Sequence, residues 1–379
     1  MTIPYFPIVC IASATALSLL GDAALYAVLP SQYANIGLTP LQVGILLSVN
    51  RWVRLVSNHL AERCYRGLPV RWLLAMAFFL ASLVTATYGY FRIFVILFVA
   101  RVLWGICFSF IRQAGIMTVV GVSSDIHLGK WMGLYRGICL IGSLFGMLLG
   151  GLGFDFFGLT FTLIAFSLFS LFSVPLSLLS QRGIHHVQLP HFKVSIGKAS
   201  LKIMLCGFAV GIVGFGLIMS TLGLIVKKQI GMSITLLDHT IGVASITGIV
   251  LAIRWGIGIV GSPVLGAIAD RIGRERSVPV LFMVGSMALG LASFPFGLFC
   301  MISGVVIVFL CGTLLGTLIS ALAGQQGAKA VASYATAFDF GSALGPLIGW
   351  SIVQFGLPTN LIFITGAVFY ILGAFVSNR

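Results

Sequence analysis

The sequence predicts an all-α integral membrane protein with twelve transmembrane helices in two pseudo-symmetric six-helix halves. Three observations support this prediction. First, 59% of the 379 residues are hydrophobic and only 8% are charged, whereas soluble domains carry about 25% charged residues. Second, apolar stretches of roughly 20 residues recur along the chain, and each is long enough as a helix to span a bilayer. Third, short motifs of the first half recur in the second half in the same order.

The individual spans follow from apolar length and from the prolines between them. The stretches are continuously apolar, which favours helices over the alternating strands of a membrane barrel. Pro30 and Pro40 flank the turn after the first span, and Pro358 opens the last span. The first apolar run has no basic segment before it and is too long for a signal peptide, so we expect an uncleaved helix. The predicted spans are 5–30, 41–60, 71–91, 93–121, 131–154, 158–180, 201–226, 241–269, 277–297, 298–322, 329–355 and 359–377.

The basic residues predict the orientation. Thirteen Lys and Arg residues lie in the loops after even-numbered spans or at the C-terminus, against three (Arg92, Lys227 and Lys228) on the other side. Basic loops stay cytoplasmic, so we expect both termini in the cytoplasm and a multi-pass protein of a bacterial-type inner (plasma) membrane. This distribution explains the net charge of +14 without a nucleic-acid partner. The polar connector 181–200 then separates an N-terminal half, 1–180, from a C-terminal half, 201–379.

Three pairs of motifs relate the two halves. "GILLSVNRW" (44–52) resembles "GIVLAIRW" (248–255), and "GSLFGMLLG" (142–150) resembles "GSALGPLIG" (341–349). "LAERCYRG" (60–67) occupies the same place after span 2 that "IADRIGRER" (268–276) occupies after span 8. Internal repeats in corresponding positions are typical of secondary transporters.

Charged side chains lie at membrane depth in several spans, and spans 3, 6, 9 and 12 have none. One arginine facing lipid costs about 2.5–3.5 kcal/mol, so six would cost on the order of 15–20 kcal/mol, more than a typical folding stability. These side chains must therefore face a wet cavity or acidic partners. The intramembrane charges are Arg51, Arg54, Arg101, Arg112, Arg136, Arg254, Asp22 and Asp339.

The excess of arginine predicts an anionic substrate, because a guanidinium binds carboxylate or phosphate through two parallel hydrogen bonds. The six arginines and Trp104 are the candidate substrate-binding residues; Arg101, Trp104, Phe108 and Arg112 form a stripe on one face of span 4. Asp22 and Asp339 are the candidate proton-coupling residues. An alternative stays open: Arg51 or Arg54 could pair with Asp22 only to hold helices together, and Arg136 could bind a neighbouring carbonyl group.

Three motifs carry a resemblance to a known family. In "GAIADRIGRER" (266–276), five positions match the cytoplasmic signature G-x-x-x-D-R-x-G-R-[RK] of the major facilitator superfamily. The first-half copy, "HLAERCYRGLPVR" (59–71), departs from it, with His59 in place of glycine, Glu62 in place of aspartate and two residues inserted before Gly67. "RVLWG" (101–105) resembles the family's fourth-span motif, while the fifth-span motif lacks its proline at Met147.

The resemblance implies alternating access between two halves and a latch at the cytoplasmic surface. The latch residues it implies are Glu62, Arg63, Gly266, Asp270, Arg271, Gly273 and Arg274. We therefore expect a monomeric secondary transporter, not an enzyme, that moves a small organic anion with protons. A polycarboxylate metabolite or a carboxylate-type metal chelator fits this expectation. An exporter of hydrophobic or cationic drugs and a non-transporting receptor or assembly subunit are the alternatives. No metal or other cofactor is expected, since the seven cysteines form no metal-binding pair and the chain has no nucleotide-binding loop.

Overall fold

A computed structural model describes residues 5–123, 127–182, 201–236, 239–261 and 274–378 of the chain. Almost all of these residues are helical, which confirms the expected all-α class. The exception is a short antiparallel hairpin of β1 (Ser233–Leu236) and β2 (His239–Gly242), which the sequence analysis did not anticipate. The helices are α1 (Tyr5–Gln32), α2 (Pro40–Gly67), α3 (Val70–Tyr90), α4 (Phe94–Val122), α5 (Leu128–Leu171), α6 (Ser173–Ser180), α7 (Leu201–Val210), η2 (Gly211–Ile218), α8 (Met219–Ile230), α9 (Val243–Gly256), η3 (Ile257–Gly261), α11 (Arg274–Ser293), α12 (Leu298–Gln325), α13 (Ala328–Gln354) and α14 (Asn360–Asn378).

Local sequence explains where several helices begin and end. Thr39 caps α2 reciprocally with Gln42, and Pro40 occupies the first turn, where its missing N–H costs nothing. Gly158 has φ 79° inside α5, a conformation that glycine adopts readily. It breaks the long helix between the two predicted spans 131–154 and 158–180. Gly231, with φ 75°, ends α8.

Nine of the described helical segments are long and apolar enough to cross a membrane. One of the nine, 128–180, contains two predicted spans, because Gly158 divides it. Helices α2 and α13, which carry polar side chains, are not among the nine, although each coincides with a predicted span. The number of crossings therefore remains a prediction.

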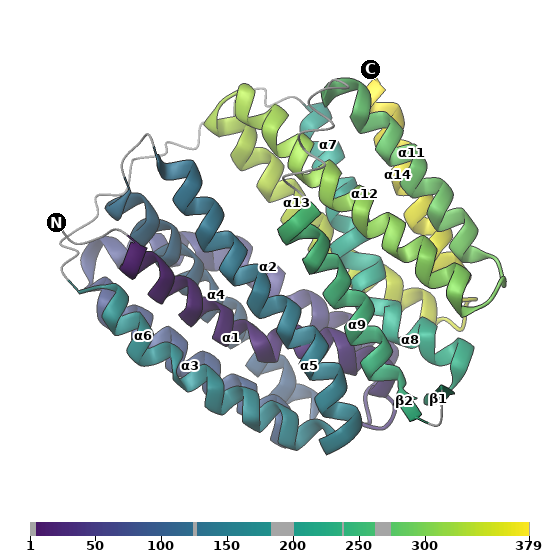
Figure 1. The fold of residues 1–379 in the computed structure, drawn as a ribbon, viewed down its shortest axis with the longest axis horizontal. Coiled ribbons are helices and arrows are strands. Elements are labelled where there is room, and N and C mark those ends of the chain that lie inside the picture. Colours follow the sequence, from purple (N-terminus) through teal and green to yellow (C-terminus); the bar gives the residue numbers. More distant parts are fainter. Residues whose placement is uncertain (1–4, 124–126, 183–200, 237–238, 262–273, 379) are drawn as a thin grey trace.

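Helices α1–α6 gather on one side of the molecule and α7–α14 on the other (Figure 1). The start of α1 and the end of α14 lie away from the β1–β2 hairpin (Figure 1). We call the end of the bundle where α1 starts and α14 ends the predicted cytoplasmic end, and the end with the hairpin the predicted external end. The two sides meet where α5 packs on α9, α2 on α13, and α1 on α8 and α9. The exact division at 180 and 201 remains a prediction.

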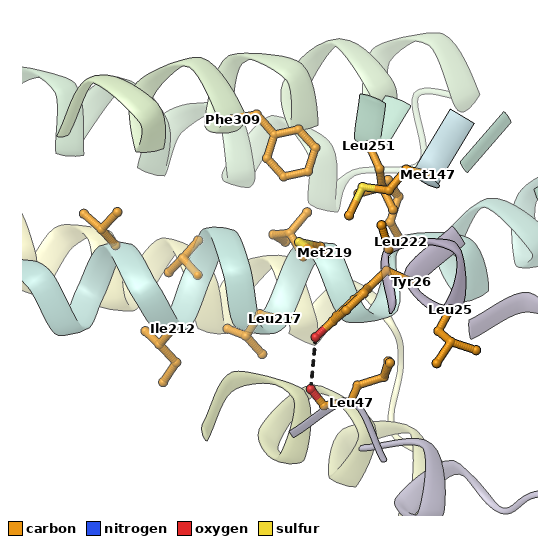
Figure 2. Packing of buried hydrophobic residues seen from close by; sticks show 14 of the residues in the cluster. Leu25, Tyr26, Leu47, Met147, Ile212, Leu217, Met219, Leu222, Leu251 and Phe309 are labelled. Atoms are coloured by element: carbon orange, nitrogen blue, oxygen red, sulfur yellow. Dashed lines mark hydrogen bonds between the residues drawn. The ribbon is translucent and has the colours of Figure 1, made fainter. Parts of the chain in front are cut away.

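Small residues bring α5 and α9 into close contact. A Cβ atom at Gly151 would overlap the carbonyl oxygen of Ala244, and one at Gly248 would overlap that of Met147. Small residues such as glycine let helix backbones approach this closely in membranes. Figure 2 shows the surrounding hydrophobic packing, with Met147 of α5 beside Leu251 of α9. It also shows Tyr26 of α1, which donates a hydrogen bond to the Leu47 carbonyl of α2 at 3.2 Å.

Candidate functional site

Two adjoining cavities lie between the two groups of helices. The deep cavity has a volume of about 270 Å³ and is lined by Asp22, Asn50, Arg51, Arg54, Trp104 and Asp339, among others. The wide cavity has a volume of about 620 Å³ and is lined by Arg112, Arg136, Arg254, Thr313, Thr317 and Tyr334, among others. Together they fall in the size range of sites for small organic molecules, roughly 300–1,000 Å³.

The wide cavity reaches toward the predicted cytoplasmic end, since its lining includes Tyr135 near the start of α5 and Ser320 near the end of α12. The predicted external end is closed by contacts between the two groups of helices. There, Lys227 Nζ donates to the Ser31 carbonyl at 2.7 Å, and the Leu41 N–H donates to Gln354 Oε1 at 3.2 Å.

Asp155 closes this end further. Its Oδ2 accepts a hydrogen bond from the Ser245 N–H at 2.7 Å, so a carboxylate of α5 caps the first turn of α9. A helix N-terminus carries partial positive charge and free N–H groups, which makes this contact favourable. The structure thus shows a pathway that is closed at one end and hollow toward the other.

An aromatic collar forms part of the wall that the two cavities share. We use this name for Phe108, Phe215, Trp255 and Phe338, which line both cavities together with Leu19, Cys139 and Leu140. Phe215 lies at the centre, with its ring centroid 4.9 Å from that of Phe338 and 5.9 Å from that of Trp255. The motif analysis of span 4 had singled out Phe108; the other three rings were not predicted, because they come from three separate segments that only the fold brings together.

Asp22 has a partner that the sequence did not identify. It accepts a hydrogen bond from Arg101 Nη1, so the pair joins α1 to α4 rather than to α2. The Arg101 side chain is only 1% exposed, and its Nε donates to the Leu46 carbonyl at 2.8 Å. Arg101 contributes to neither cavity lining, unlike Trp104, Phe108 and Arg112, so the predicted stripe of α4 does not face the pathway along its whole length.

Two arginines bind the backbone of the π-helix η2. Arg51 Nη1 donates to the carbonyls of Phe215 and Ser342, at 3.2 and 2.8 Å. Arg254 Nη1 donates to the carbonyl of Gly214 at 2.7 Å, and its guanidinium lies 3.7 Å from the Phe215 ring centroid. Arg51 and Arg254 occupy equivalent places in the motifs "GILLSVNRW" and "GIVLAIRW", and here they hold consecutive residues of one turn.

Sequence reasoning missed η2 altogether. Its segment "GIVGFGLI" is glycine-rich, but no pattern distinguishes a π-turn from an ordinary membrane helix. π-turns occur frequently at functional sites. This turn both supplies Phe215 to the collar and offers its carbonyl groups to Arg51 and Arg254.

The remaining three arginines have weaker partners or none among the described residues. Arg112 Nη1 lies 3.6 Å from Asp339 Oδ2, which links α4 to α13 across the pathway. Arg54 has a buried Nε without a hydrogen-bond partner, and its guanidinium lies over the Phe108 ring at 5.3 Å. Arg136 is exposed on the wall of the wide cavity, with no ion pair in the part of the chain that the structure describes.

Asn50 adds a second unpartnered polar group to the deep cavity. It is 5% exposed, and its Oδ1 has no hydrogen-bond partner. It lies one turn before Arg54 on α2. Buried polar atoms normally have a partner, so these two residues mark the edge of α2 that faces the cavity as a candidate ligand contact.

The predicted latch lies mostly outside the described residues. This is true of Gly266, Asp270, Arg271 and Gly273, and Arg274 begins α11 directly after this gap. In the first-half copy, Glu62 pairs with Arg66 one turn away on the exposed face of α2, and Arg63 is exposed. The role of these residues stays a prediction. Among the described residues, no group of three His, Cys, Asp or Glu side chains is arranged to hold a metal ion.

Comparison with known proteins identifies the fold. Residues 11–346 match the Major Facilitator Superfamily. The chain is 28% identical over 305 residues to "Multidrug resistance protein MdtG" of Dickeya zeae (strain Ech586), with 73% of this chain and 69% of that protein covered. A crystal structure of a bacterial homologue of the human lysosomal transporter Spinster, in an inward-facing and occupied conformation, superimposes with TM-score 0.78 and 14% identity, covering 100% of this chain and 97% of the other. A mutant of the nucleoside transporter NupG superimposes with TM-score 0.76 and 12% identity, covering 98% and 99%.

Proposed function

Because this chain belongs to the major facilitator superfamily, we propose that it carries small organic anions across a bacterial inner membrane by alternating access. Family membership makes the protein a multi-pass membrane transporter rather than an enzyme. Family membership does not specify the substrate or the coupling ion. We propose that the substrate is an anion and that its transport is coupled to protons.

One observation favours an anion as the substrate: the charge of the side chains that line the cavities. Five arginines line the two cavities (Arg51, Arg54, Arg112, Arg136 and Arg254), against the aspartates Asp22 and Asp339. Arg101, behind the cavity wall, already neutralises Asp22. Five guanidinium groups therefore share one carboxylate, Asp339. Between the low-dielectric walls of the two cavities this uncompensated positive charge attracts anions and repels the organic cations that many drug exporters carry.

The contacts divide the arginines into two groups. Arg51 and Arg254 already donate to carbonyl groups of η2, and we assign them to holding that turn in place. Arg54, Arg112 and Arg136 line the cavities and donate no hydrogen bond within the described part of the chain, and we assign them to the anion. Planar guanidinium donors suit carboxylate or phosphate oxygens.

Asp339 is the better candidate for proton coupling. Asp22 is bound to a buried arginine that does not line the pathway, whereas Asp339 faces Arg112 at 3.6 Å. An anion that binds Arg112 would displace Asp339, whose carboxylate would then be free to accept a proton. The same step would break an ionic contact between α4 and α13, so binding, protonation and movement of the two halves would be linked.

The test is a thermal-shift screen of the purified protein against organic anions and organic cations. A ligand that binds only the folded state raises the melting temperature. We expect anions alone to do so, and Arg54→Gln and Arg112→Gln to remove the effect while Arg54→Lys keeps part of it, since lysine retains charge but not the planar fork. Arg92→Gln, in the turn between α3 and α4, is the matched control. Stabilisation by cations, or unchanged stabilisation by anions in both glutamine variants, would contradict the proposal.

A second candidate is export of hydrophobic drugs. It is favoured by the similarity to a protein named for multidrug resistance and by the aromatic lining of the pathway. The same screen separates the two functions, because neutral and cationic compounds would then stabilise the protein and the glutamine substitutions would leave that effect unchanged.

A further inference from the structure

The aromatic collar indicates which kind of organic anion the cavities would bind. Its four rings come from α4, η2, α9 and α13, and they line the deep and the wide cavity alike. Arg54 lies on the deep side, and Arg112 and Arg136 lie on the wide side. A substrate that passes between the cavities therefore moves along the collar, with arginine on both sides.

The rings are held in definite positions. Phe215 meets Trp255 and Phe338 edge to face, with interplanar angles of 70° and 72°. Trp255 Nε1 donates to the sulfur of Met147 at 3.0 Å, which fixes the indole. Trp104 stacks on Phe108 at 5.9 Å and extends the aromatic surface into the deep cavity. Rings fixed in this way lose little entropy when a planar ligand packs against them.

A polar polycarboxylate fits poorly against the collar. Its charged groups would lose water at the collar without gaining hydrogen bonds there, and burying an unpaired polar group is costly. A flat ring system would instead pack on the collar through stacking and edge contacts. Its charged group would reach Arg54, whose buried Nε donor has no hydrogen-bond partner among the described residues.

We propose that the transported anion carries a flat aromatic or conjugated ring system, which packs against the collar while its carboxylate or phosphate binds Arg54. This inference rests on the proposed function, because it takes anion transport as its starting point. It selects aromatic acids over the polycarboxylates that the charge pattern alone would admit.

The experiment compares three probes by calorimetric titration of the purified protein in nanodiscs. 2-Naphthoate is aromatic and anionic, decahydro-2-naphthoate has the same charge and carbon skeleton without the π-system, and 2-naphthamide keeps the rings without the charge. We expect 2-naphthoate to bind about tenfold more tightly than decahydro-2-naphthoate, a difference that corresponds to one or two good aromatic contacts, and the amide to bind weakly or not at all.

Each other outcome has a definite meaning. Equal affinity for the two anions, or no binding of 2-naphthoate, would overturn the inference, and in the first case anion transport would stand. Equal affinity for 2-naphthoate and its amide would overturn the proposed function itself. We expect Trp255→Leu to abolish the preference for the aromatic anion and Trp255→Phe to restore most of it.

Two further variants serve as a control and as a replacement for Trp255→Leu. Trp72→Leu removes a tryptophan that is 61% exposed on α3 and lines neither cavity, and it should keep the full preference. If Trp255→Leu does not fold, Phe338→Leu removes a different ring of the collar and should also reduce the preference. A full preference in both folded collar variants would contradict the proposal.

Discussion

Individual residues show what a sequence can and cannot predict about this site. The arginines at membrane depth were evident from their cost in lipid, and the structure places five of the six around the cavities. Their partners were not evident, because pairing depends on how helices rotate and pack. Arg51 or Arg54 of α2 was considered as the partner of Asp22, which binds Arg101 of α4 instead.

The two aspartates should therefore respond differently to neutralisation. We expect Asp339→Asn to abolish uptake driven by a pH gradient in proteoliposomes while substrate exchange at equal pH persists, because Asp339 is the coupling group. Asp22→Asn should instead destabilise the fold by about 3–5 kcal/mol, since it leaves Arg101 buried without its carboxylate. Melting temperatures of both variants check the second statement, and Arg101→Gln added to Asp22→Asn should recover part of the loss. If Asp22→Asn melts normally and alone loses gradient-driven uptake, the roles are reversed.

At the scale of elements, helix positions were predicted well because apolar length and Pro and Gly residues determine them. The break at Gly158 coincides with the start of the predicted span 158–180. Two features escaped prediction for physical reasons. The π-turn η2 accepts hydrogen bonds from Arg51 and Arg254, which are distant in the sequence. The close contact of α5 and α9 requires Gly151 and Gly248 to meet the opposite backbone.

The α5–α9 contact is expected to hold the external end closed. Gly248→Ala would place a Cβ atom against the Met147 carbonyl, and Asp155→Asn would remove the negative charge at the start of α9, where a charged cap contributes about 1 kcal/mol. We expect both variants to increase external labelling of Cys139, kept as the sole cysteine, by an impermeant thiol reagent in intact cells. Gly290→Ala, at a helical glycine with open space around it, is the control and should leave labelling unchanged. If all three variants label alike, this contact does not gate the pathway.

At the scale of the whole molecule, the distribution of Lys and Arg predicted the orientation in the membrane. The structure shows in addition which end of the pathway is closed. If both termini are cytoplasmic, the wide cavity opens to the cytoplasm and the contacts of Lys227, Asp155 and Gln354 close the outer side. The sequence could not predict this state, because the same chain must adopt both states during transport and only tertiary contacts distinguish them.

Three single-cysteine variants test orientation and state together. Cys64 lies near the end of α2 at the predicted cytoplasmic end, Cys300 near the start of α12 at the predicted external end, and Cys139 on the wall shared by both cavities. We expect an impermeant thiol reagent to label Cys300 from outside intact cells, and to label Cys64 and Cys139 in inside-out vesicles. The Cys64 and Cys300 results decide the orientation, and external labelling of Cys64 would reverse it.

Labelling of Cys139 then shows which end of the pathway is open. With the orientation established, equal labelling of Cys139 from both sides would mean that the closed external end is not the predominant form in the membrane, whereas protection of Cys139 by 2-naphthoate in inside-out vesicles would place the substrate in the cavity that this state exposes.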